Sequence, residues 1–197
     1  MAFIGMRYLV AAPVTDYTEG SEITYGPGFV IGPAAAANLT YQVNDNPDFG
    51  DDVELNNDIG VNGYNGTVDA NHIEDNIKAN LFGWETIGTT DFEYEQTDQE
   101  PPLHGWGFMR VLLKPNSNTP YYECKWFHLA RFSQQNLTAS TKQRQITWNH
   151  PQMNVNGIGA HIDNSGKAKW FRHKTFDNFA DAKAWMNAKA GITAATT

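Results

Sequence analysis

Six carboxylates lie within one short stretch of the chain, and their type and spacing could suggest calcium binding. They are Asp45, Asp48, Asp51, Asp52, Glu54 and Asp58. A regular calcium loop also requires glycine at its sixth position and glutamate at its twelfth. Counted from Asn44, these positions hold Phe49 and Leu55, so only an irregular calcium loop stays open as the alternative. Because unpaired charges are costly to bury, we expect an extended acidic loop over residues 44–66 that faces solvent or another subunit.

Other side chains that could do chemistry are scattered. The six histidines lie singly, and no two have a spacing that would bring two ring nitrogens to one metal ion. Ser133 and Ser140 lack the context of a nucleophile elbow, and Cys124 lies in the alternating run YYECKWF, which is typical of a buried strand thiol. A pair of acids for glycoside hydrolysis would be assembled in space, and nothing specific points to one. We therefore predict no catalytic residue, no metal site, no cofactor and no enzymatic activity.

Aromatic residues are numerous in the second half of the chain. A sugar-binding face is one interpretation, but core or interface positions on strands are the favoured one. The residues concerned are Trp106, Phe108, Tyr121, Tyr122, Trp126, Phe127 and Trp148.

Length and charge limit the class of protein. A chain of 197 residues suits one domain with its own core. Its net charge of −8 argues against a grip on nucleic acid, which needs clustered Lys and Arg. No stretch is apolar enough for a signal peptide or a membrane span. We expect a soluble protein that is made in a cytoplasm.

Two helices are predicted from apolar residues at helical spacing. The first stripe consists of Ile73, Ile77 and Leu81. It predicts a helix over residues 69–82 that packs on a β body, with Asp69 as its N-cap and Gly83 as its stop. A second amphipathic pattern predicts a helix over residues 176–190, ended by Gly191.

Strands are predicted for much of the rest. The clearest pattern is a hairpin of residues 105–113 and 121–132 around the turn PNSNTP. Further strands are expected over residues 37–43 and 143–149, and a second hairpin over 159–162 and 169–172. Other regions are expected to be an N-terminal arm that is strand-like in part (1–20), a surface insertion (91–102) and a frayed C-terminus (191–197). Together these elements predict a single-domain, mainly β fold, an antiparallel β-sandwich or barrel-like body with two helices outside.

The order of three stretches resembles the major tail proteins of long-tailed bacteriophages (siphoviruses), in particular a group common in phages of Gram-positive hosts. The first is ITYGPGFVIGPAAAANLT, followed by the acidic segment with DDVE and by IEDNIKANLFG. The second runs from WGFMRVLLKPNSNTPYYECKWFHLARF to QRQITWNHPQMNVNGI, and the third is KTFDNFADAKAWMNAKAG. The chain departs from the pattern in its Asn- and Gly-rich acidic segment and in the insertion at residues 91–102.

This resemblance implies a structural virion protein. Such subunits form hexameric rings that stack into the tail tube, and the genome passes through its lumen without specific binding. The implied partners are further copies of the chain, the tape measure protein, and the tail terminator and baseplate proteins. The implied location is the virion tail, after synthesis in the host cytoplasm.

Two other classes stay open: the tube protein of a contractile injection system, and a carbohydrate-binding β-sandwich. Under the tail-tube interpretation, the acidic segment bridges subunits or successive rings. Its deletion over residues 45–58 is then expected to leave a folded subunit that no longer polymerises.

Overall fold

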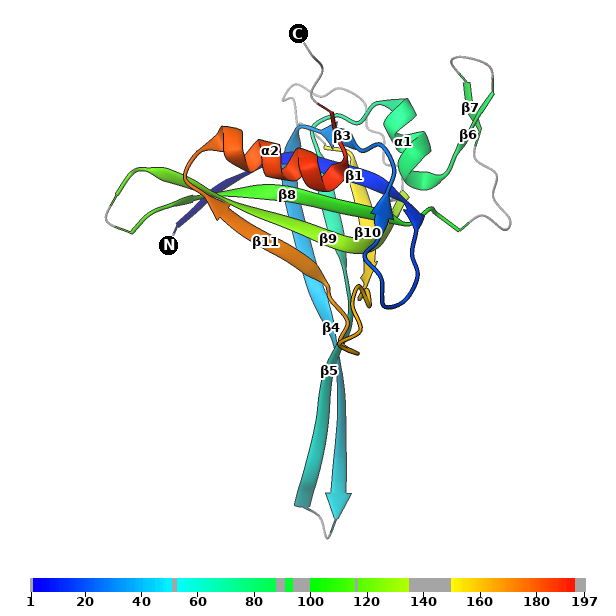
Figure 1. The fold of residues 1–197 in the computed structure, drawn as a ribbon, viewed down its shortest axis with the longest axis vertical. Coiled ribbons are helices and arrows are strands. Elements are labelled where there is room, and N and C mark those ends of the chain that lie inside the picture. Colours follow the sequence, from blue (N-terminus) through cyan, green and yellow to red (C-terminus); the bar gives the residue numbers. More distant parts are fainter. Residues whose placement is uncertain are drawn as a thin grey trace, which may run out of the picture.

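A mainly β architecture with two helices is seen in a computed structural model, which confirms the predicted fold class (Figure 1). The structure describes residues 2–50, 53–87, 91–93, 100–115, 117–134 and 150–193. The strands of the main sheet are β1 (Ala2–Asp16), β2 (Thr24–Tyr25), β3 (Phe29–Gly32), β4 (Ala34–Gly50), β5 (Val53–Ala70), β8 (His104–Leu113), β9 (Pro120–Gln134), β10 (Gln152–Ile158) and β11 (Phe171–Phe176). The helices are α1 (Asp75–Phe82) and α2 (Phe179–Ala190).

The main sheet is antiparallel and divides at β9. The strand order among the described residues is β2-β1-β8-β9-β10-β5-β4, with β3 paired to β1 and β11 paired to β9. One edge of β9 pairs with β8. The other edge pairs with β11 over residues 122–127 and with β10 over residues 129–134. The predicted hairpin over residues 105–113 and 121–132 is thus confirmed as β8 and β9.

The larger of two hydrophobic cores, here called the inner core, lies on the face of this sheet opposite to α2. Trp106 stacks on Phe127 with ring centroids 4.8 Å apart, and its indole N–H donates to the Tyr64 hydroxyl at 2.9 Å. Side chains of α1 and of the segment before it extend the same core. The buried members include Leu9, Ile31, Tyr64, Val68, Ile73, Leu81, Phe82, Trp106, Phe127, Phe132, Met153 and Val155.

A second core lies on the opposite face of β1, β8 and β9, where α2 covers the sheet (Figure 1). Three buried helix residues, Ala182, Met186 and Ala190, pack there. Cys124 is buried beneath α2, and burial raises the pKa of its thiol to about 12. This environment agrees with the interpretation of Cys124 as a strand thiol.

The helix limits differ from those predicted. The C-terminal helix starts at Phe179, because Phe176 is the last residue of β11. The first helix starts at Asp75, since Asp69 lies in β5 and accepts a hydrogen bond from Gln152 at 2.6 Å. Both helices end at a glycine in the left-handed region, Gly83 and Gly191.

The N-terminal stretch forms a strand of the main sheet over Ala2–Asp16. Its partly strand-like character is confirmed, but its assignment as an arm was wrong. β1 pairs with β8 along its length, and residues 9–12 are completely buried. Pro13 interrupts the apolar residues of this stretch. It lies between the part of β1 that pairs with β3 and the part that pairs with β2, where a strand can lack one N–H donor.

Three other predicted segments have different outcomes. The predicted strand over 143–149 lies outside the described residues. The 159–162 and 169–172 hairpin is reduced to one bridge, between Ala160 and Lys169, because β11 pairs with β9 instead. In the predicted insertion, β7 (Asp91–Glu93) pairs with β6 (Glu85–Ile87).

Candidate assembly surfaces

The acidic segment forms a long β-hairpin, so its assignment as an extended loop over residues 44–66 was wrong. β4 and β5 pair continuously, apart from three register shifts, from Ala34 opposite Ala70 to Gly50 opposite Val53. β10 pairs with β5 only from Gly63 onward. Beyond that point, residues 43–50 of β4 and 53–61 of β5, here called the acidic ribbon, pair only with each other among the described residues. The ribbon projects from the body (Figure 1).

The register of the acidic ribbon separates its charges. Asp45 lies opposite Ile59, Asp48 opposite Asn56, Glu54 opposite Phe49, and Asp58 opposite Asn46. Like charges placed directly opposite each other destabilise a strand pair, and no two of these four acids occupy opposite positions. Asp51 and Asp52 lie outside the described residues. A two-stranded ribbon also satisfies backbone hydrogen bonds without a core, which explains how a polar sequence can form strands.

The base of the acidic ribbon exposes apolar side chains. Val43 and Val61 lie opposite each other and are 57% and 43% exposed. Tyr41, within β4, and Ile158, the last residue of β10, are also exposed. Exposed apolar side chains gather here, beside a ribbon whose strands pair only with each other among the described residues. This region is therefore a candidate contact surface.

Two strand edges flank an apolar groove of about 400 Å³. Among the described residues, β4 pairs only with β5, and residues 2–8 of β1 pair only with β8. Apolar side chains from both edges line the groove, including those of Phe3, Met6, Leu39 and Tyr41. Unpaired edges can accept strands of another chain.

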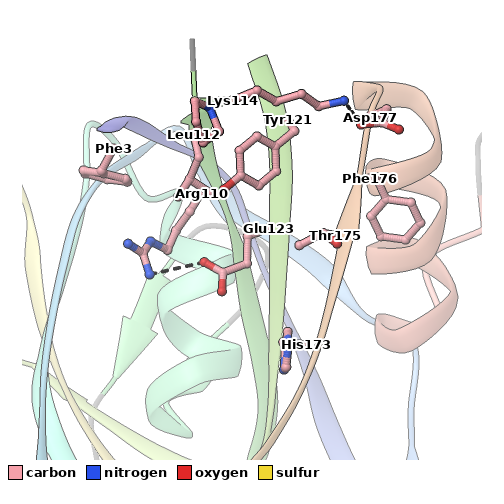
Figure 2. A pocket seen from close by; sticks show the side chains of 11 residues that line it. Phe3, Arg110, Leu112, Lys114, Tyr121, Glu123, His173, Thr175, Phe176 and Asp177 are labelled. Atoms are coloured by element: carbon pink, nitrogen blue, oxygen red, sulfur yellow. Dashed lines mark ion pairs between the residues drawn. The ribbon is translucent and has the colours of Figure 1, made fainter. Parts of the chain in front are cut away.

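A larger groove of about 730 Å³ lies over β8, β9 and β11 (Figure 2). Arg110 pairs with Glu123 at 3.2 Å, and its guanidinium lies 5.3 Å from the centre of the Phe3 ring. Lys114 pairs with Asp177 at 2.6 Å. These charged groups are already matched, and the groove combines apolar and charged side chains, a mixture that is common at protein contacts.

A third, smaller pocket of about 160 Å³ lies beside α2. Its floor includes His128 and Trp126, which are 4% and 1% exposed. Burial, more than the nearby cations, lowers the pKa of His128 to about 4. Its rim includes Arg172, which pairs with Glu22 at 2.5 Å. The sequence analysis did not identify this pocket, because its members are far apart in the chain.

The apolar stripe of Ile73, Ile77 and Leu81, which was predicted to pack a helix on the β body, lies at the inner core. Leu81 and Ile73 are buried there and Ile77 packs against it, although Ile73 precedes the helix. No group of three or more His, Cys, Asp or Glu side chains suited to a metal ion occurs in the part of the chain that the structure describes.

The aromatic residues considered for a sugar-binding face are mostly internal. Trp106, Phe108, Trp126 and Phe127 are buried in the two cores. Tyr121 and Tyr122 are half-buried, and Trp148 lies outside the described residues. These rings therefore form no exposed stacking platform in the described structure.

No known protein-family model matches the chain, and no curated protein matches it. No helix within the described ranges is long and apolar enough to cross a membrane. The fold and the surfaces described above therefore carry the functional inference.

Proposed function

We propose that this chain is a structural subunit of a bacteriophage tail tube. Copies join into hexameric rings, the rings stack, and DNA passes through the lumen during ejection. The observation that carries the proposal is the acidic ribbon, which extends from the body and whose strands pair only with each other among the residues that the structure describes.

The dimensions of the acidic ribbon suit contact with another copy. Eight residues of β4 lie beyond the last position supported by β10, and at about 3.3 Å per residue they reach about 25 Å. An isolated two-stranded hairpin is marginally stable in water. Contact with a neighbouring subunit would bury the exposed valines at its base and stabilise it.

The open edges of the sheet favour a ring. An unpaired edge is an aggregation hazard in a lone subunit. The β1 and β4 edges lie on opposite flanks of one groove, so a neighbouring copy can cover them by a head-to-tail contact. Such a contact closes into a ring when its rotation permits, and stacked rings make a tube.

The charge of the chain suits a conduit. Its net charge is −8, and no Lys or Arg interrupts the acids between Asp45 and Asp58. Negative charge repels the phosphate backbone and keeps DNA from sticking.

Negative-stain electron microscopy of the purified chain tests this proposal. The key variant replaces residues 45–59 with Asn-Gly, a pair that favours a tight hairpin turn and that here joins the opposed residues Asn44 and Gly60. We expect tubes from the unmodified chain and folded, dispersed subunits from the variant.

The control is Phe179→Ala, which removes an exposed ring on α2 far along the chain from the ribbon. It is expected to form tubes. Tubes from the ribbon-deleted variant, or an unmodified chain that stays monomeric at high concentration, would contradict the proposal.

A further inference from the structure

We propose that the acidic ribbon of one copy adds as a further strand along the open edge of β11 in a second copy. The inference rests on the proposed function, because it names the surface that receives the ribbon during assembly. Three observations carry it: an unpaired strand edge, opposite charges on the two elements, and matching lengths.

β11 has an edge that is open to another chain. One of its edges pairs with β9, from Phe171 opposite Phe127 to Phe176 opposite Tyr122. Its other edge has no partner strand among the described residues, and β11 lies at the margin of the sheet (Figure 1). Such an edge presents backbone N–H and C=O groups that can pair with an incoming strand.

Positive charge lies along this edge. Lys174 is exposed, and none of the ion pairs within the described ranges includes it. Its ammonium lies 5.1 Å from the centre of the Phe176 ring. Lys125 on β9 is likewise absent from these ion pairs, and its ammonium lies 5.2 Å from the centre of the Phe171 ring. Lysine on an edge strand keeps most other strands away, so this edge selects an acidic one.

The charge of the chain is divided between its two halves. Residues 1–100 hold 18 acids and two bases, a net charge of −16, and residues 101–197 hold four acids and 12 bases, a net charge of +8. The acidic ribbon belongs to the first half and β11 to the second. Contact between these elements of two copies brings opposite charges together, which favours association and fixes its orientation.

The other open edges described above match β11 less well. Residues 2–8 of β1 carry one cation, Arg7, and no acid, and residues 34–43 of β4 carry no charged side chain. A second β11 edge would bring Lys174 close to Lys174 of the other copy, and like charges across a strand pair are destabilising. Of these edges, the acidic ribbon alone has a charge opposite to that of β11.

The lengths of the two elements also match. β11 spans six residues, which at about 3.3 Å per residue extend over about 20 Å, and the ribbon reaches about 25 Å. A third strand also stabilises a ribbon that is marginal as an isolated pair. Because the ribbon and β11 are different elements, the contact is head-to-tail, as a ring requires.

Two measurements on the full, unmodified chain test the contact. In protein assembled from equal amounts of ¹⁴N and ¹⁵N chains, a carbodiimide joins carboxylates to nearby lysine amines. We expect mixed-isotope peptides that link the acids of the ribbon to Lys174. Amide hydrogen exchange should also slow at least about tenfold on assembly at alternate residues of β11, because a strand partner bonds every second N–H along that edge.

A charge reversal provides the matched comparison. Lys174→Glu is expected to weaken association at least about tenfold, measured by sedimentation at low ionic strength, because it places an acid against the acidic ribbon. The control is Lys183→Glu, which changes the net charge equally. Lys183 is also an exposed lysine over an aromatic ring, at 5.3 Å, but that ring is Tyr8 of β1. The control should associate as the unmodified chain does.

The outcomes separate this contact from the proposed function. Tubes without cross-links between the ribbon and β11, or equal association of the two variants, would overturn the contact and leave the tail-tube proposal standing. Assemblies other than tubes that show the cross-links and the slowed exchange would support the contact and contradict the tail tube. A chain that stays monomeric at high concentration would overturn both.

Discussion

Trp106 on β8 donates its indole N–H to the hydroxyl of Tyr64 on β5, at 2.9 Å, in the centre of the inner core. In the strand order, β8 lies on one side of β9, and β5 lies on the other side, beyond β10. Tyr64 is completely buried, and burial raises the pKa of its hydroxyl well above the usual range. This hydrogen bond therefore links β8 to β5 and satisfies both the indole N–H of Trp106 and the hydroxyl of Tyr64.

Tyr64→Phe should destabilise the fold, because it leaves the Trp106 N–H buried without an acceptor. We expect a loss of about 1–3 kcal/mol in the free energy of unfolding, measured by urea denaturation. Tyr41 lies opposite Tyr64 on β4 and is 43% exposed. Tyr41→Phe is the matched control and should change stability little. Equal effects of the two substitutions would show that the Trp106–Tyr64 hydrogen bond contributes nothing measurable.

Gly157→Ala should also destabilise the inner core. A Cβ at this position would lie 1.9 Å from the Tyr64 ring, whereas a Cβ at Gly60 meets nothing within 4 Å. Overpacking costs about 1–3 kcal/mol or more, so the urea midpoint of the Gly157 variant should fall clearly. Gly60→Ala should match the unmodified chain. A normal midpoint for both variants would mean that Tyr64 moves aside without cost.

The N-terminus of α2 allows a third comparison, between a helix with a side-chain cap and one without. The Asn178 side chain accepts a hydrogen bond from the Asp181 N–H at 2.8 Å, whereas Glu74 at the start of α1 makes no such bond. Asn178→Ala should cost about 1 kcal/mol, seen as a lower melting temperature by circular dichroism. Glu74→Ala is expected to have a much smaller effect, and the reverse order would contradict the assignment of the cap.

Local patterns in the sequence predicted the elements that depend on local signals. The β8–β9 hairpin follows from alternation around a turn, and α2 follows from its apolar stripe and Gly191. Pro13 interrupts the apolar pattern of β1, although a strand can include proline at a position that pairs with one neighbouring strand only. The acidic ribbon was missed because Asn, Asp and Gly have low strand propensity. Its two strands form because they pair with each other. This pairing cannot be recognised from either segment alone.

The small pocket could not be predicted from the sequence. Its rim joins Glu22 to Arg172 across 150 positions of the chain, and its floor lies on β9. Alternation identified β9 as a strand but not which polar side chains on it would be buried. Single histidines carry no spacing signal, and only the packing of α2 and β2 around β9 encloses His128.

The buried His128 predicts a loss of stability in mild acid. Its pKa is lowered from 6.5 to about 4 in the folded chain, mainly because burial disfavours the charged ring. The unfolded chain therefore binds a proton more readily, and stability rises with pH across this window. The contribution of the neutral ring is complete above pH 6.5 and is lost as the pH falls toward 4.

In a buffer without carboxylates, we expect roughly 2–4 kcal/mol less stability at pH 4 than at pH 7 from this residue. His104 is also buried with a lowered pKa and acts in the same direction, so the measurement is the difference between the unmodified chain and His128→Gln in urea unfolding. That difference should change across pH 4–7. A difference that is constant with pH would mean that His128 titrates normally in the folded chain.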